Sequence, residues 1–428
     1  MSCFYESIEQ LQKEIVWQNT KVFNEAAKII SPAGHIQIGE IGKMPCCDNA
    51  PEGIENVGKD NIVISKFDWD SHETSWDFKT NELYRLALGL TYDQVESSLM
   101  TNVGLNLSLE EVVSRYTKFW QEKFMQLHAN EEELNRQFIE IYGLQDELTP
   151  DVPLDEITIL QKGEKSIEEG QIVWHKDVII KQFISWLAGC FMGRYSVDKP
   201  GLIIASQGQK VEDLDLPAQT LEIDDDGIIP IVQEADFFVD DMTQRIEAAV
   251  RTLFGEDYFY ENMKYIKACL GQELRDYLYK DYYNDHLQMY SVKGAKRPIY
   301  WLFSSRMGDK KKKGYFKALV YMHRLEPDTL SKLHADYVHP YLQKIEQQQI
   351  EAEDQAARDD LSQAQRNKAL KQADEMKEKV REVKAFETQL VEMASHRLSI
   401  DLDDGVKANY PKFYPLVEPI RGLEASED

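Results

Sequence analysis

The sequence predicts a mainly α-helical fold with small β elements (α+β). Residues 342–398 contain no proline or glycine, and their apolar positions recur at steps of three and four, a spacing typical of helices. Two short apolar runs rich in aromatic and β-branched residues, 299–303 and 315–322, are joined by a Gly- and Lys-rich loop, which indicates a β-hairpin. We therefore expect helical domains, a basic β-hairpin region and an antiparallel coiled-coil hairpin.

Helical spacing begins near the N-terminus, with apolar residues from Ile8 to Ile29, and the helix should end at Ser31-Pro32. Asn130 is a suitable N-cap for a helix beginning at Glu131, because Glu133 completes a capping box. Short strands are expected at 35–41 and 202–205. Further helices are expected at 83–90, 109–127, 131–142, 176–192, 242–254 and 261–283.

The stretch 342–398 is too long for one helix without a partner, which would extend roughly 85 Å. Two antiparallel helices joined near residues 365–367 explain it better, although a single long helix stays open as an alternative. The coiled-coil seam in its second half is expected at Ala373, Met376, Val380, Val383, Phe386, Leu390 and Met393. Glu382 and Lys384 are expected on the outer surface of the helix.

The predicted β-hairpin lies within a basic part of an acidic chain. The formal net charge is −26, yet residues 264–324 hold 14 Lys and Arg against 5 Asp and Glu. Residues 211–244 hold 11 acids and no Lys or Arg. Such asymmetry favours one anion-facing surface, although lysine loops are also often no more than solvated hairpin tips. The candidate cations are Lys293, Lys296, Arg297, Arg306, Lys310, Lys311, Lys312, Lys313 and Arg324.

Composition divides the chain into five segments and indicates the cellular compartment in which we expect the protein. We expect an N-terminal helix and loop at 1–60, a helical domain at 61–175, an α+β DNA-recognition domain at 176–341, the coiled-coil hairpin at 342–398 and a docking tail at 399–428. Five cysteines without Cys-x-x-Cys spacing form neither a disulfide framework nor a zinc site. No signal peptide follows Met1, and the apolar window 178–191 is too short to span a bilayer. We expect a cytoplasmic protein without a membrane partner.

The sequence shows no catalytic constellation and no convincing metal site. Asp68, Asp70, His72 and Glu73 resemble metal ligands, but a polar turn pinned by Trp69, Trp76 and Phe78 is the better interpretation. Three consecutive aspartates at 224–226 lack the alternate spacing of a calcium loop and favour a solvated acidic loop. His334 and His339 are five residues apart, which places them on different faces of an α-helix.

Six separated stretches, in this order, resemble the C-terminal part of the adenine-specific DNA methyltransferases of BREX phage-exclusion systems, the PglX family. They are TSWDF at 74–78; NEEELNRQFIEIYGLQDEL at 130–148; GCFMGRYS at 189–196 with PGL at 200–202; KRPIYWLFS at 296–304; FKALVYMHR at 316–324; and IDLDDGVK at 400–407. The family implies site-specific transfer of a methyl group to adenine N6. It also implies S-adenosylmethionine, a Gly-rich loop that binds it, and an Asn-Pro-Pro-Tyr motif.

The chain contains neither the Gly-rich loop nor the Asn-Pro-Pro-Tyr motif. No catalytic residue and no cofactor can therefore be assigned to it, and we expect a fragment, a split product or a truncated protein that is inactive alone. The resemblance implies that the part after the catalytic core recognises double-stranded DNA. The nine cations would then contact the DNA, with arginines the better readers of base edges, while Tyr300 and Trp301 pack the hairpin.

An alternative function needs no DNA contact. The acidic body and the coiled coil would then form an interaction module that docks a methyltransferase core or other BREX proteins. Deleting the coiled-coil hairpin would separate the two hypotheses, because only the second predicts loss of a protein partner with DNA binding intact.

Overall fold

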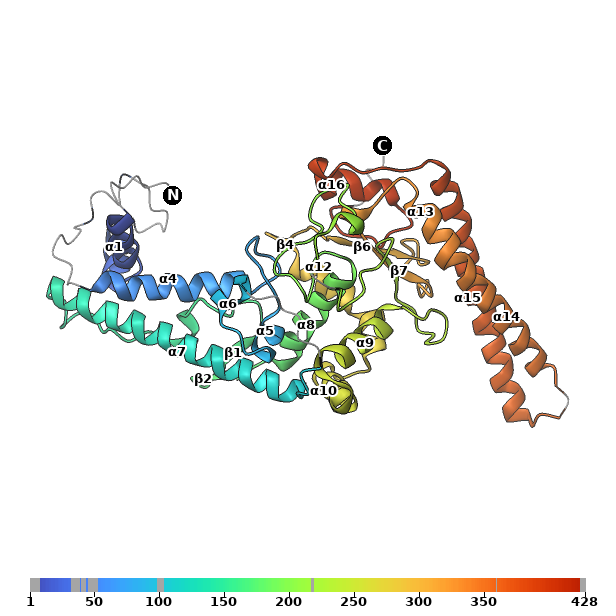
Figure 1. The fold of residues 1–428 in the computed structure, drawn as a ribbon, viewed down its shortest axis with the longest axis horizontal. Coiled ribbons are helices and arrows are strands. Elements are labelled where there is room, and N and C mark those ends of the chain that lie inside the picture. Colours follow the sequence, from blue (N-terminus) through green and yellow to red (C-terminus); the bar gives the residue numbers. More distant parts are fainter. Residues whose placement is uncertain are drawn as a thin grey trace. The chain divides into compact units, whose positions relative to one another are not determined.

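The computed structural model describes residues 8–31, 39, 44, 53–97, 104–216, 219–358 and 360–423. It confirms a mainly α-helical protein with small antiparallel sheets (Figure 1). The chain forms two compact units, Met1–Asp77 with Glu111–Ile179, and Phe78–Glu110 with Ile180–Asp428. The five segments expected from composition stay a prediction, and the strand expected at 35–41 lies outside the described residues. Within the described ranges, no helix combines the length and apolar content that crossing a bilayer requires.

The first unit consists of helices and one small hairpin. Its elements are α1 (Ile8–Gln18), α2 (Lys21–Ile30), α4 (Ile54–Asp70), most of α7 (Leu109–Tyr142), β1 (Lys165–Glu168) and β2 (Gln171–Trp174). Trp17, Phe23 and Phe138 belong to one apolar cluster that joins α1 and α2 to α7. Helix α1 packs closely on α4, because Gly58 leaves the space that the Val16 side chain occupies.

Helix α7 corrects the expectation of two helices between 109 and 142. It is continuous over 34 residues, so Asn130 is not an N-cap. The Asn130 side chain instead donates to Asn61 Oδ1 of α4 at 2.7 Å. A polar residue that can satisfy its amide on a neighbouring helix has no need to end its own helix.

The turn after α4 forms separate polar contacts. His72 Nε2 lies 2.6 Å from Glu164 Oε1, while Asp70 accepts from the Ser75 hydroxyl at 2.7 Å. Phe78 is buried, but Trp69 and Trp76 are 59% and 90% exposed. The expectation that both tryptophans pin this turn is therefore wrong.

The second unit surrounds a three-stranded sheet. Its helices are α5 (Glu82–Ala87), α6 (Tyr92–Ser97), α8 (Lys176–Phe191, within this unit from Ile180), α9 (Met242–Phe254), α10 (Phe259–Leu270), α11 (Leu274–Lys280), α12 (Tyr282–Met289), α13 (Thr329–Lys332), α14 (His339–Ala356), α15 (Gln363–Ser395) and α16 (Gly405–Asn409). The helix expected at 261–283 is thus divided, first at Gly271 in a left-handed conformation. The strand expected at 202–205 does not form.

The sheet has the order β3 (Ile228–Pro230), β7 (Lys317–Tyr321), β6 (Tyr300–Ser304), and both strand pairs are antiparallel. Every residue of the three strands is buried, which explains why their sequences lack polar alternation. The outer edge of β6 is covered by the C-terminal segment, because Ser304 N–H donates to Leu416 O and Glu418 N–H donates to Leu302 O, each at 2.9 Å. A second small hairpin pairs β4 (Ser291–Val292) with β5 (Ala295–Lys296).

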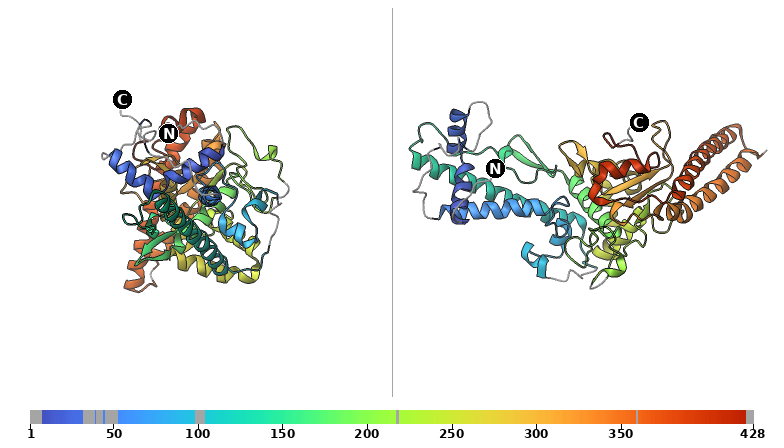
Figure 2. Two further views of the ribbon diagram at one scale, coloured as in Figure 1. Left: turned by 90° about the vertical axis from the view of Figure 1, so that its left-hand side faces the viewer. Right: turned by 90° about the horizontal axis from the view of Figure 1, so that it is seen from above.

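Helices α14 and α15 lie side by side as a helical hairpin (Figures 1 and 2). Their junction differs from the expected position near 365–367, since α15 begins after Ser362. The Ser362 hydroxyl accepts from Gln365 N–H, and the Gln365 side chain accepts from Ser362 N–H. This capping box fixes the start of the helix. Val383, Phe386 and Leu390 of the expected seam are fully buried.

We predict that Gly58→Ala destabilises the first unit by about 1–3 kcal/mol, because the new Cβ would lie 2.0 Å from Val16 Cγ2. This overpacking opposes the ~1 kcal/mol that alanine normally adds in a helix. Urea unfolding measures the loss. Val16→Ala makes room for the new methyl group, so the double variant should lose less stability than the two single losses added together. Strict additivity would contradict the close packing of α1 on α4.

Candidate nucleic-acid interface

The predicted basic hairpin exists, but its strands belong to the core. Strands β6 and β7 pair from Tyr300↔Tyr321 to Ser304↔Lys317. Tyr300 and Trp301 have no exposed surface, and the Trp301 ring lies 5.2 Å from the ring of Tyr410. The expectation that these two aromatic residues pack the hairpin is confirmed. Any contact with a nucleic acid in this region must therefore come from the loop between the strands.

The loop between β6 and β7 presents four consecutive lysines, residues 310–313, which we call the lysine loop. Lys310, Lys311 and Lys313 are exposed, and Lys312 is half-buried. Asp309 shapes the start of the loop: its carboxylate accepts from Lys311 N–H at 2.9 Å, and its backbone carbonyl accepts from Lys312 N–H at 3.0 Å. Four adjacent cations on an ordered turn form a compact positive surface.

The end of the lysine loop is held by Glu382 of α15. Oε1 of Glu382 accepts from the Ser305 hydroxyl at 2.6 Å and from the backbone N–H groups of Gly314 and Tyr315 at 2.9 and 3.0 Å. Oε2 accepts from Lys313 N–H at 3.1 Å. Glu382 is only 6% exposed, so four donors take the place of the water that its charge would otherwise require.

The expectation that Glu382 lies on the helix surface is wrong. It precedes Phe386 by four residues and adjoins Val383, so the three-and-four spacing already places it on the buried face of α15. A carboxylate on that face is tolerated because the loop supplies backbone donors. Lys379, one turn earlier, is also buried and forms an ion pair with Glu234.

A second group of cations lies on the β4–β5 turn. Lys293, with φ of +50°, and Arg297 are exposed, while Lys296 is half-buried. The backbone N–H of Arg297 donates to Tyr290 O at 2.9 Å, which holds the chain where it leaves β5. The exposed cations therefore lie on or beside two hairpins of the second unit, β4–β5 and β6–β7.

Arg306 and Arg324, the other two candidate cations, are bound to the protein itself. Arg324 donates to the backbone carbonyls of Asp224 and Asp225, both at 2.6 Å, and burial lowers the pKa of its guanidinium. Arg306 lies 3.8 Å from a carboxylate oxygen of Glu418. Their hydrogen-bonding capacity is thus partly used within the fold.

The acidic loop at 224–226 is partly buried, which corrects the expectation of a solvated loop. Asp224 is 2% exposed and accepts from Gly227 N–H at 2.6 Å and from Arg245 at 2.8 Å. Burial, and then the neighbouring Asp224, raise the pKa of Asp226 to about 8. The internal hydrogen-bond donors to Asp224 and the raised pKa of Asp226 both reduce the repulsion among these carboxyl groups.

Arg194 follows α8 and is not one of the nine candidate cations. Its Nε donates to the Tyr195 hydroxyl at 3.0 Å, and a terminal nitrogen donates to the Tyr321 hydroxyl at 3.3 Å. Among the described residues, no carboxylate forms an ion pair with it. Gly189 makes room for this arrangement, because a Cβ there would lie 2.5 Å from the Tyr195 ring.

Two neutral histidines complete the surroundings of Arg194. Burial, and then the charge of Arg194, lower the pKa of His286 to about 3 and that of His323 to about 4. In the described part of the chain, His286 Nδ1, His323 Nδ1 and the Tyr300 hydroxyl are buried without a hydrogen-bond partner. Three of the six stretches that carry the family resemblance, 189–196, 296–304 and 316–324, therefore meet at this cluster.

A cleft of about 390 Å³ lies next to the Arg194 cluster and includes His323 and Arg324 in its wall. Lys210 and Lys332 also line it, but Glu212, Asp225, Asp226 and Glu326 do so too. The cleft therefore combines charges of both signs, which suits phosphate groups less well than an exposed group of lysines does. The exposed turns remain the better candidates for contact with DNA.

Two curated relatives match the chain over nearly its whole length. The adenine-specific methyltransferase BrxX of Escherichia coli O9:H4 (strain HS) is 32% identical over 425 residues, which is 95% of this chain and 32% of that protein. The adenine-specific methyltransferase PglX of Lacticaseibacillus casei (strain Zhang) is 30% identical over 411 residues, 93% of this chain and 31% of that protein. The chain is a relative of the PglX-family methyltransferases.

The resemblance to the PglX family inferred from six stretches is thus confirmed. The chain spans about a third of the length of the curated relatives it matches. No family model matches it.

We predict that Glu382→Gln loosens the lysine loop and lowers the free energy of unfolding by about 1.5–3 kcal/mol, because the amide directs an NH₂ group at backbone donors. Hydrogen exchange at Lys313, Gly314 and Tyr315 measures the local effect. Glu392→Gln changes an exposed residue of the same helix and is the matched control. Equal exchange in both variants would mean that Glu382 does not order the loop.

We predict that His323 makes the protein less stable in acid. Its folded pKa of about 4 lies below the ordinary value of 6.5, so the unfolded chain takes up the proton first as the pH falls. Stability is therefore lost from about pH 6.5 down to about pH 4, by roughly 3 kcal/mol in total. Urea unfolding of His323→Gln at pH 7.5 and pH 5 should show a smaller loss than the unsubstituted protein. The same pH dependence in both would contradict a buried neutral imidazole.

Proposed function

We propose that the chain is the DNA target-recognition and spacer portion of an adenine-specific DNA methyltransferase of a BREX phage-defence system. The similarity to BrxX and PglX over more than nine tenths of the chain supports this proposal. The sequence holds neither a Gly-rich loop of the family's type nor an Asn-Pro-Pro-Tyr motif, so we assign it no S-adenosylmethionine site and no step of methyl transfer. That chemistry would belong to a catalytic core outside these 428 residues.

The single observation that carries the DNA-facing role is the ordered lysine loop. The backbone of the loop is fixed by Asp309 at its start and Glu382 at its end, so little conformational entropy is lost when the loop meets a ligand. Neither Lys310 nor Lys311 forms an ion pair with another described residue. Both ammonium groups are thus available to phosphate oxygens, and their flexible stems suit contacts that do not depend on base sequence.

Exposed Arg297 is the better candidate for reading base edges. A guanidinium can donate two parallel hydrogen bonds to guanine in the major groove, and Arg297 has its side chain in solvent with its backbone fixed on Tyr290. Arg306 and Arg324 are less suited to this role, since each already contacts the protein.

The test compares two double variants of the 428-residue chain that remove the same charge. Lys310→Ala/Lys311→Ala should weaken binding to duplex DNA about equally for all sequences. The slope of log affinity against log salt should fall by roughly 0.9 for each lysine that contacts a phosphate. Fluorescence anisotropy at several salt concentrations measures both quantities.

Lys368→Ala/Lys371→Ala is the control, because both lysines are exposed on α15 within the helical hairpin. Affinity and salt slope should be unchanged in this variant. Equal effects in the two double variants would show that net charge alone matters. Unchanged binding in the loop variant would overturn the assignment of the lysine loop.

A further inference from the structure

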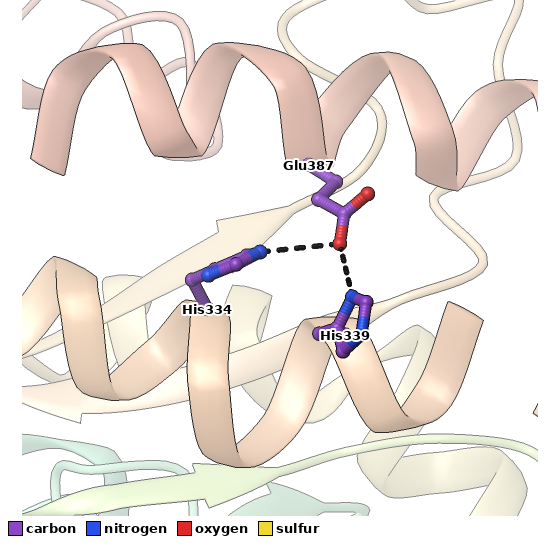
Figure 3. A group of neighbouring side chains, drawn as sticks. All are labelled: His334, His339 and Glu387. Atoms are coloured by element: carbon purple, nitrogen blue, oxygen red, sulfur yellow. Dashed lines mark hydrogen bonds and ion pairs between the residues drawn. The ribbon is translucent and has the colours of Figure 1, made fainter. Parts of the chain in front are cut away.

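Two histidines and one glutamate meet at the base of the helical hairpin. His334 Nε2 lies 3.1 Å from Glu387 Oε1, and His339 Nδ1 lies 2.8 Å from the same oxygen (Figure 3). The histidines precede and begin α14, while Glu387 belongs to α15. The three side chains therefore connect the two helices of the hairpin.

A π-helical turn, Leu333–Val338, brings the two histidines together. On an α-helix, residues five apart would point about 140° away from each other. Here the backbone N–H of His339 donates to the carbonyl of His334, a bond that spans five residues. The expectation that the two imidazoles lie on different faces is wrong, because it assumed α-helical geometry. π-Helical turns are rare and recur at functional sites.

The donor set and spacing suit a transition-metal ion. One ligand atom from each residue lies within 4.8 Å of the other two. A tetrahedral zinc ion with bonds near 2.1 Å holds its ligand atoms about 3.4 Å apart, so small side-chain rotations would complete the site. Two imidazole nitrogens and a carboxylate are ligands that zinc and similar divalent ions accept.

The hydrogen bonds of the cluster show how such an ion would be accommodated. Without an ion, each imidazole can donate an N–H to Glu387 Oε1. A divalent cation would take the place of these hydrogen bonds and bind the nitrogen lone pairs, and each neutral imidazole would then carry its proton on the other ring nitrogen. The side chains of His334, His339 and Glu387 are 31%, 49% and 18% exposed, which leaves an approach for the ion and for a water ligand.

Gln343 lies where it can orient the ring of His339. Its side-chain amide lies 3.0 Å from His339 Nε2, the ring nitrogen that faces away from Glu387. Turning the amide by 180° presents its oxygen, which would accept the Nε2–H that a histidine bound through Nδ1 carries. Metal-bound histidines usually have such a partner, because it fixes the tautomer and the ring orientation.

We propose that His334, His339 and Glu387 bind one divalent transition-metal ion of the zinc class, with Gln343 orienting His339. The ion would cross-link the base of α14 to α15, the helix that also carries Glu382. This site is separate from the lysine loop, and its existence does not depend on DNA binding.

The test titrates Zn²⁺ into the chelator-treated 428-residue chain and measures heat release, with Co²⁺ as a spectroscopic probe. We expect one ion per chain and a visible Co²⁺ spectrum of low coordination number. Gln343→Ala should weaken binding by roughly 10–100-fold. His334→Ala and His339→Ala should each weaken it by more than Gln343→Ala does. Zn²⁺ should also raise the thermal unfolding midpoint of the unsubstituted chain.

His396→Ala is the matched control, since this exposed histidine caps the C-terminal end of α15. It should leave Zn²⁺ affinity unchanged. His334→Gln retains a polar side chain and tests the site if the alanine variant does not fold. The proposal is overturned if the unsubstituted chain binds no ion at millimolar Zn²⁺. It is also overturned if the His334 and His339 variants bind as tightly as the His396 control.

Discussion

The contact between Glu382 and the β6–β7 loop joins the principal parts of the second unit. A buried carboxylate on a long, otherwise polar helix is unfavourable unless its oxygens are satisfied, and here a single loop satisfies both. The helix therefore cannot leave the sheet without exposing a set of backbone donors, and the loop cannot change shape without leaving a charge in the core. The helical hairpin and the lysine loop thus form one structural piece, which gives the loop a defined conformation despite its charge.

Although the chain is acidic, it contains two kinds of cationic side chain. Arg194 and Arg324 lie against tyrosine hydroxyls and backbone carbonyls, where their charge supports the fold. Lys310, Lys311 and Lys293 extend into solvent, where salt screens their interactions. Only the second kind can contribute strongly to salt-dependent binding. The net charge of −26 is therefore a poor guide to the anion-facing surface, because it adds the charges of groups bound within the fold to those of groups in solvent.

Much of the fold follows from local signals in the sequence. The β6–β7 hairpin could be predicted because two apolar runs flank a loop, and α9 begins and ends where its apolar spacing does, at Met242 and Phe254. Asn130 misled the interpretation because its amide is satisfied by Asn61, a residue 69 positions away. A contact between residues so far apart in the sequence cannot be inferred from a short stretch of it.

The candidate site was predictable only in part. Tyr300 and Trp301 were correctly placed in the core, and the six stretches pointed to the relatives that the chain matches. The role of Glu382 depends on a loop about 70 residues earlier in the chain, and only its spacing from Phe386 pointed inward. Arg194 lacked any signal of its own, because its importance comes from three segments that meet in space. The π-helical turn was missed because standard helical spacing was assumed.

That turn also makes the number of residues between α13 and α14 a constraint on the fold. A π turn holds one more residue than an α-helical turn, so it shifts the angular phase of everything that follows by about 100°. Leu330 before the turn and Tyr341 and Ile345 after it are all buried. Removing one residue from Leu333–Val338 would turn α14 by about 100° relative to α13. Selection on this segment would thus act on its length as well as on its side chains.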